Sequence, residues 1–335
     1  CSMKPSAEAQ KPAGSGSCWE ASQMVHATCS KTGRAGTPMS IERPKIFVTK
    51  KNISVEPRRS SSPTDAEIKD LRKGVVTASR VSAFYTNHIA KARLANRRPM
   101  IMQRDAVQIL TQMRGQKVYV CEQPSENERI IHAASMLWDE EIPVPERNAD
   151  KRYKVERFLE IGTQVSELAG YGFQWLLTAI ILLEQLLYDP TGTVYAATYG
   201  DNDVAGPNFI KNMMFLPWED VPETVLALRL HHLDSGGELS RGVKWFRPTL
   251  RTVEGAAHLI VDIDQNPNRS AKGDGAQIPE IELRFDENEF QKVSYKELVE
   301  FAHALIANPP KTYSELKQFS SRTLSPTFLD FEGKW

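Results

Sequence analysis

The sequence predicts an α-rich α+β fold, with a helical core around a buried central helix, a basic disordered N-terminal arm and a smaller mixed α/β C-terminal part. Three observations lead to this prediction. A long apolar stretch occupies residues 153–189, the first 63 residues are mostly small, polar or basic, and short apolar runs separated by turn residues follow residue 192. The length of 335 residues allows two domains. We therefore expect an arm at 1–63, a helical core domain at 64–192, and a mixed α+β domain with a C-terminal tail at 193–335.

The apolar stretch is most continuous between Glu167 and Glu184, which enclose sixteen uncharged residues. A bilayer span needs about 20 apolar residues, so this run is short for a membrane helix. It also contains two glycines and several polar side chains, which favours a helix buried inside a globular fold. Pro190 and Gly192 predict where the helix ends, because proline lacks the amide donor and glycine permits a left-handed turn. No membrane span is expected.

The segment before this stretch shows helical signals. Thr64 with Glu67 three residues later forms a capping box, and apolar residues at helical spacing follow as far as residue 89. A second helix is expected at 103–114, a short strand at 116–122 and a further helix at 125–137, where Ser125 and Glu128 repeat the capping pattern. Within the arm, only residues 45–49 read as a strand.

Shorter elements are expected beyond residue 192. Their apolar runs and turn residues predict strands at 193–199, 242–246, 258–263 and 281–285. Capping residues and helical spacing predict helices at 208–215, 221–231 and 294–307.

The distribution of charge is the most informative global feature. Residues 1–115 carry 20 Lys and Arg against 8 Asp and Glu, a balance of +12, while residues 116–335 carry 22 against 34, a balance of −12. This asymmetry indicates either a basic segment for a polyanion or head-to-tail contact between copies of the chain. A solvated basic tail with no specific partner is the plainer alternative.

Binding to nucleic-acid phosphates requires many cations in one region rather than an exact spacing. The basic half of the chain meets this requirement. It shows no zinc finger, no ribonucleoprotein motif and no clear helix-turn-helix, so non-specific binding is expected, to RNA in the first place. The candidate contacts are Lys50, Lys51, Arg58, Arg59, Arg72, Lys73, Arg80, Arg93, Arg97, Arg98 and Arg104.

One group of residues could suggest an iron site. His231, His232 and Asp234 contain the H-x-D half of a two-histidine, one-carboxylate centre, for which His258 or His303 would supply the third ligand. The pattern follows a helical segment rather than a strand, so a histidine pair at a helix end is the simpler interpretation.

Other motifs for chemistry are incomplete. The alternating Asp262, Asp264, Asn266 and Asn268 resemble the start of a calcium loop but lack its glycine and its final glutamate. The chain contains no phosphate-binding loop and no nucleophile elbow. We therefore expect no catalytic residue, no metal ligand and no cofactor, and predict that the chain is not an enzyme.

The four cysteines show no metal-ligand spacing, which predicts free thiols in an intracellular protein. They are Cys1, Cys18, Cys29 and Cys121.

A basic arm, basic helices, an apolar core and an acidic C-terminal part together resemble the general layout of coat or nucleocapsid proteins. The resemblance implies a structural, self-assembling homo-oligomer that packages nucleic acid through its basic N-terminal region, located in a virion or the cytoplasm. The alternative is a non-catalytic accessory subunit of a large organellar complex, such as a ribosome or a respiratory assembly, in a mitochondrion or plastid.

Overall fold

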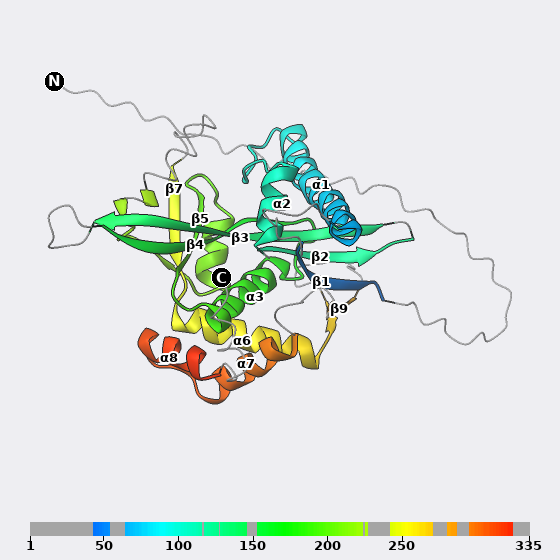
Figure 1. The fold of residues 1–335 in the computed structure, drawn as a ribbon. Coiled ribbons are helices and arrows are strands. Elements are labelled where there is room, and N and C mark those ends of the chain that lie inside the picture. Colours follow the sequence, from blue (N-terminus) through cyan, green and yellow to red (C-terminus); the bar gives the residue numbers. More distant parts are fainter. Residues whose placement is uncertain are drawn as a thin grey trace, which may run out of the picture. The chain divides into compact units, whose positions relative to one another are not determined.

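A mixed nine-stranded sheet lies at the centre of the fold (Figure 1). The computed structural model describes residues 43–53, 64–115, 117–126, 128–145, 153–223, 225–226, 242–270, 280–286 and 295–323. The strands follow the order β6-β7-β5-β4-β3-β2-β1-β9-β8. The protein therefore has an α/β fold, and the predicted α-rich α+β class with a helical core is wrong.

The strands come from widely separated parts of the chain. Their bounds are β1 Lys45–Lys51, β2 Val118–Pro124, β3 Arg129–Pro145, β4 Tyr153–Ser166, β5 Thr193–Tyr199, β6 Leu216–Pro217, β7 Val243–Arg247, β8 Asn268–Arg269 and β9 Ile281–Phe285. Pairing is antiparallel except for β1 with β9 and β4 with β5. The sheet thus takes strands from either side of residue 192, and the division of the chain at residues 63 and 192 stays a prediction.

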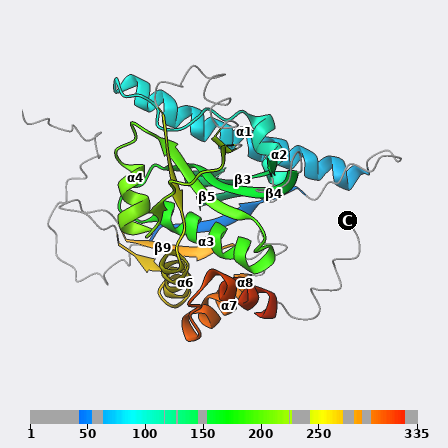
Figure 2. The ribbon, with the colours of Figure 1, turned by 90° about the vertical axis from the view of Figure 1, so that its left-hand side faces the viewer.

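Helices cover both faces of the sheet (Figure 2). Helices α1, Asp65–Leu94, and α2, Ala106–Arg114, pack on one face, where they contact β2 and β3. Helix α3, Phe173–Tyr188, packs on the other face with α6, Leu250–Gln265, α7, Tyr295–Ala307, and α8, Tyr313–Thr323. Strand β2 shows the alternation between the two layers, because Val118 and Val120 contact the α1 side while Tyr119 and Cys121 contact the α3 side. Cys121 is a buried free thiol.

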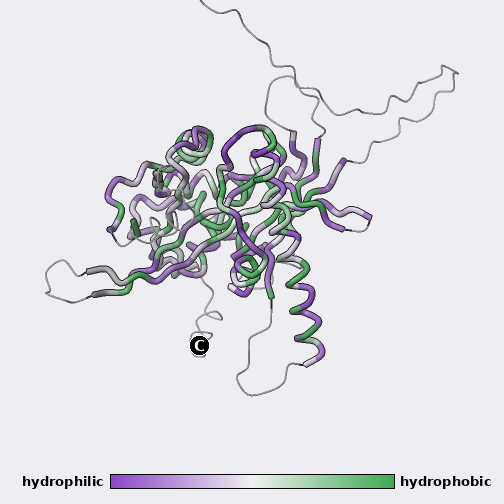
Figure 3. The backbone as a smooth tube through the Cα atoms, turned by 90° about the horizontal axis from the view of Figure 1, so that it is seen from above, coloured by the Kyte–Doolittle hydropathy of each residue, from purple (hydrophilic) through white to green (hydrophobic). Residues whose placement is uncertain are grey.

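Several expected elements are confirmed. Helix α1 begins with the capping box of Thr64 and Glu67, and α3 ends at Tyr188, directly before the predicted stop. Twelve residues of α3 are buried, as expected for a core helix. Strands β5 and β9 and helix α7 match their predictions within one residue. Figure 3 shows hydrophilic and hydrophobic residues mixed along α1, as expected for a helix with one face on the sheet and the other in solvent.

The hairpin of β3 and β4 is where the structure departs most from the secondary structure predicted from the sequence. The predicted helix at 125–137 is wrong, because residues 129–145 form β3 and residues 153–166, assigned to the apolar helical core, form β4. The Ser125 and Glu128 pattern forms a turn instead of a helix cap, in which the Ser125 amide donates to the Glu128 carbonyl at 2.7 Å. Successive residues are buried in the middle of each strand, at 133–137 and 158–162, so these parts do not show the simple alternation of a strand with one exposed face.

Two further corrections follow from the structure. The expected strand at 258–263 lies inside α6. The strand predicted at 45–49 is confirmed as β1, but it pairs with β2 and β9 within the sheet instead of lying in a disordered arm. The helical prediction at 208–215 is met in part by the single π-turn Asn208–Asn212, which follows the short helix α4, Ala205–Pro207. Most of the 221–231 prediction lies outside the described residues.

Two buried ion pairs are built on consecutive residues of β1. The Lys50 ammonium lies 2.6 Å from the Glu184 carboxylate of α3, on one face of the sheet. The Lys51 ammonium lies 2.5 Å from Glu122 of β2, which also accepts from Arg129 at 2.7 Å. Successive side chains of a strand point to opposite faces, so two adjacent lysines can reach two separate carboxylates.

The lowered pKa values of three carboxylates predict that the fold loses stability in acid. Burial alone raises the pKa of Glu122, but Lys51 and Arg129 outweigh it and hold the pKa below the usual 4.5. Burial also raises the pKa values of Asp139 and Glu167, but cationic partners lower both overall. For Asp139 these partners are Arg157 and Lys117. A group with a lowered pKa stabilises the fold above its unfolded-state pKa and loses this contribution as pH falls through its folded-state pKa.

We therefore expect the thermal midpoint to fall as pH drops below about 4.5. Differential scanning calorimetry across this range measures it. The Glu122→Gln variant, which cannot be protonated at this site, should lose less stability than the wild type over the same pH interval. A midpoint that is flat to pH values well below the usual carboxylate range would contradict the expectation.

None of the described helices is long and apolar enough to cross a membrane.

Candidate nucleic-acid interface

The eleven candidate cations do not form one surface. Arg58 and Arg59 lie outside the described residues. Lys50 and Lys51 lie in the two buried ion pairs described above, where they stabilise the sheet. These two lysines are not placed to contact a polyanion, and their burial could not be predicted from two consecutive basic residues.

Two more candidates are half-buried and engaged with neighbours. Arg80 donates to the backbone carbonyl of Arg129. The guanidinium of Arg104 lies 4.3 Å from the centre of the Trp138 ring, and its Nε donates to Thr163 Oγ1 at 3.3 Å. A cation over an indole face is an attractive contact, so Arg104 is fixed against β3 and β4 rather than displayed to solvent.

The remaining five candidates are exposed and fall into two groups at the two ends of α1. They are Arg72, Lys73, Arg93, Arg97 and Arg98. At a rise of about 1.5 Å per residue, the 21 positions between Arg72 and Arg93 separate the groups by about 30 Å along the helix.

The two groups differ in local charge balance. Residues 65–73 hold three Lys or Arg and three Asp or Glu, so their charges cancel. Residues 91–104 hold five Lys or Arg and no Asp or Glu. We call Arg93, Arg97 and Arg98, the three exposed arginines of this second segment, the arginine cluster. Arg93 forms no ion pair with any residue in the described ranges.

The end of α1 positions this cluster. Asn96 has a φ of 52°, in the left-handed region that asparagine tolerates, and the Arg97 amide donates back to the Ala92 carbonyl at 2.8 Å. Pro99 then prevents the helix from continuing. Cations also interact favourably with a helix C-terminus, so part of the positive charge stabilises α1 itself. Arg98 lies 3.8 Å from Asp201, which ties the segment to the residues after β5.

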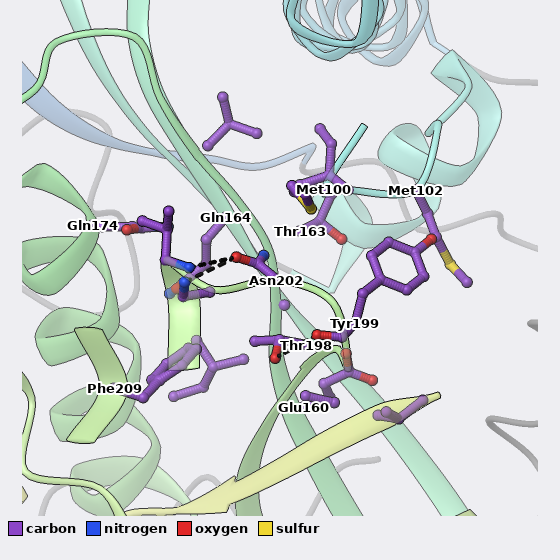
Figure 4. A pocket seen from close by; sticks show the side chains of 18 of the residues that line it. Met100, Met102, Glu160, Thr163, Gln164, Gln174, Thr198, Tyr199, Asn202 and Phe209 are labelled. Atoms are coloured by element: carbon purple, nitrogen blue, oxygen red, sulfur yellow. Dashed lines mark hydrogen bonds between the residues drawn. The ribbon is translucent and has the colours of Figure 1, made fainter. Parts of the chain in front are cut away.

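The segment after the arginine cluster lines a cavity of about 520 Å³ (Figure 4). Met100, Met102 and Arg104 contribute from this segment, and residues 160–166 of β4, 197–199 of β5 and 201–205 contribute from the sheet and the β5–α4 connection. The cavity therefore forms where the α1–α2 layer meets the ends of two parallel neighbouring strands.

A β-bulge in β4 lies in the lining of this cavity. The register steps from Ala134 opposite Val165 to Met136 opposite Gly162, so β4 has one extra residue at this point. Thr163 within the bulge has a φ of 52°, which is unusual for a β-branched residue. Its hydroxyl accepts from Trp138 Nε1 at 3.1 Å, and its carbonyl accepts from the Tyr85 hydroxyl at 2.7 Å. Strained backbone of this kind gathers at functional sites.

Three amide side chains also line the cavity, and each is held by one hydrogen-bonded end. Gln164 Nε2 donates to Thr178 Oγ1 at 2.5 Å, and Gln174 Oε1 accepts from Asn208 Nδ2 at 3.3 Å. The oxygen of Asn202, a residue only 7% exposed, accepts from two backbone amides at 3.2 and 2.9 Å. These residues could not be identified from the sequence, because they are far apart in the chain and form no motif.

The residues considered for metal binding do not come together. His231, His232 and Asp234 lie outside the described residues, and His258 and His303 are exposed on α6 and α7. Asp262 and Asp264 lie on the last turns of α6 rather than in a loop. Within the described ranges, no group of three His, Cys, Asp or Glu is arranged to hold a metal ion.

No protein-family model matches the chain, and no curated protein matches its sequence.

Proposed function

We propose that the protein is a structural, self-assembling protein that binds and packages nucleic acid, with the arginine cluster as its main phosphate contact. The observation that supports this most directly is the charge of residues 91–104, where five cations occur without an acidic residue and three arginines are exposed at one end of α1. Arginine is well suited to this role, because its planar guanidinium binds two phosphate oxygens at once.

Binding through this cluster is non-specific in the proposal. Arginines that contact phosphates release counterions, which adds affinity that does not depend on base sequence and that salt weakens. The surface holds no recognition helix or zinc module in the part of the chain that the structure describes.

Self-assembly would follow from charge complementarity between copies. Glu219, Asp220 and Glu223 are exposed within six residues that contain no Lys or Arg. A head-to-tail contact between this acidic segment and the basic end of a second copy is heterologous, so it generates rings or filaments rather than isolated dimers. Such extended assemblies are what a packaging protein requires.

Charge-matched variants test the phosphate contact. We expect the triple change Arg93→Gln, Arg97→Gln and Arg98→Gln to weaken binding of a fluorescent single-stranded RNA by about tenfold at low salt, and to make the slope of log K against log salt less negative by about 2. Fluorescence anisotropy over a salt series measures both quantities.

The control is the triple change Lys69→Gln, Arg72→Gln and Lys73→Gln at the charge-balanced end of α1. It removes the same total charge and should bind RNA nearly as the wild type does. Equal losses in both variants would mean that only net charge matters, and no loss in either would contradict the assignment of the cluster.

A further inference from the structure

We propose that the 520 Å³ cavity beside the arginine cluster binds a nucleobase, while the phosphate of the same nucleotide rests on the arginines outside. The proposal rests on the proposed function for its phosphate contact, and on the geometry of the cavity for everything else. The volume falls within the roughly 300–1,000 Å³ range of ligand pockets.

The walls of the cavity suit a flat ring. Met100, Met102 and Phe209 line it, and Figure 4 shows Met102 on the side opposite Gln174. Methionine thioethers make favourable contacts with aromatic rings and adapt to irregular gaps. The phenyl ring of Phe209 is itself packed against Phe246 with ring centres 5.3 Å apart, so this wall is rigid.

The three side-chain amides of the cavity supply both hydrogen-bond donors and an acceptor. Because Gln164 donates through its nitrogen to Thr178, its carbonyl oxygen is the group that it can offer to a ligand. Gln174 and Asn202 use their oxygens within the protein, so each can offer its NH₂ group. Nucleobase edges carry adjacent donors and acceptors, and Asn and Gln are the side chains that pair with them in two-point contacts.

Charge fixes the orientation of the ligand. Three carboxylates, those of Glu160, Asp201 and Asp203, line the cavity together with one arginine, Arg104, whose guanidinium is held over the Trp138 ring. Glu160 is buried. These carboxylates would repel a phosphate from the interior. At the edge, Arg98 lies 3.8 Å from Asp201, which places its guanidinium next to the cavity lining. A nucleotide therefore enters with its base inward and its phosphate outward, toward the arginine cluster.

The same chemistry is present in a free nucleotide and in an unstacked nucleotide of an RNA strand. Single-stranded nucleic acids are commonly bound with phosphates on cations and individual bases in pockets or on stacking surfaces. The cavity would thus hold one base of a packaged strand, or a mononucleotide from solution.

Isothermal titration calorimetry on the full chain tests the inference. The probes are the four nucleoside monophosphates and ribose 5-phosphate, which has the phosphate without the base. We expect at least one nucleoside monophosphate to bind at least about tenfold more tightly than ribose 5-phosphate, a difference equivalent to one or two hydrogen bonds. Equal binding of all five compounds, or binding of none, would overturn the proposal.

Variants locate the base. Gln164→Leu and Gln174→Leu should each weaken the preferred nucleotide by about tenfold and leave ribose 5-phosphate unchanged. Gln103→Leu is the matched control, because Gln103 lies between Met102 and Arg104 of the cavity lining but does not line the cavity itself and donates to Thr86. If one of the two variants fails to fold, the other variant still tests the position of the base. The comparison of nucleoside monophosphates with ribose 5-phosphate on the wild type tests the proposal independently.

Competition with labelled RNA separates the two ligand sources and the two proposals. A nucleotide that displaces RNA shows that a strand uses the cavity, and a nucleotide that binds without displacing RNA assigns the cavity to free nucleotides. Nucleotide binding without any RNA binding would sink the proposed function and keep the inference. RNA binding without nucleotide binding would overturn the inference and keep the proposed function.

Discussion

Replacing Glu122 with glutamine is expected to lower the free energy of unfolding by about 3–5 kcal/mol, because it breaks a buried ion pair from one side. The Glu122 side chain is 1% exposed and lies 2.5 Å from the Lys51 ammonium and 2.7 Å from an Arg129 nitrogen. Thr49 also donates to it at 3.3 Å. Without the carboxylate, the positive charge of the buried lysine is poorly compensated in a low-dielectric region.

Urea denaturation followed by circular dichroism measures this change. The matched control is Glu280→Gln, which removes the carboxylate of the well-exposed Arg43–Glu280 pair and should cost about 1 kcal/mol or less. If both variants lose the same small amount, the Lys51–Glu122 pair does not have the buried geometry described above.

Replacing Ile180 with alanine is expected to cost about 2–5 kcal/mol, through lost apolar burial and the cavity that remains. Ile180 lies in the middle of α3 and is 0% exposed. It belongs to the main core cluster, which joins α3 to the sheet and to α6 and α7. The substitution therefore probes the layer that organises one face of the protein.

The control for this experiment is Val76→Ala on the outer surface of α1. Val76 is 60% exposed, so its truncation should change stability by no more than about 0.5 kcal/mol. A loss for Ile180→Ala as small as the control would show that α3 is not packed as the structure has it.

Local signals predicted the elements that depend on local chemistry. The capping box at Thr64, the stop after Tyr188 and the strand at 193–199 are all encoded by residues within a few positions of one another. The apolar character of α3 likewise reflects its burial, whichever neighbours cover it.

The fold class failed because the sheet depends on contacts between distant segments. Strand β1 pairs with β9 more than 230 positions later. The middle of the β3–β4 hairpin is covered on both faces, at 133–137 and 158–162, which removes the period-two pattern there. Residues 153–189 therefore looked like one helical region although a strand and a helix divide it. The lysines of β1 looked like surface cations, because the sequence alone does not show that a carboxylate lies next to β1 on each face of the sheet.

The candidate site could be predicted only in part. The exposed arginines at the C-terminal end of α1 could be predicted from the basic composition of residues 91–104. The cavity did not, because its amides come from β4, α3 and the β5–α4 connection and meet only through the sheet topology. The bulge at Thr163 also has no sequence signature, since a β-branched residue rarely adopts a positive φ.

The most direct test of the central claim is size-exclusion chromatography with light scattering and the ratio of absorbance at 260 to 280 nm, on untagged protein at low and high salt. A structural protein that packages nucleic acid should elute as a large species with a high ratio at low salt, and should dissociate or lose its nucleic acid as salt rises. A nucleic-acid-free monomer at both salt concentrations would contradict the claim and would favour a subunit that awaits a protein partner.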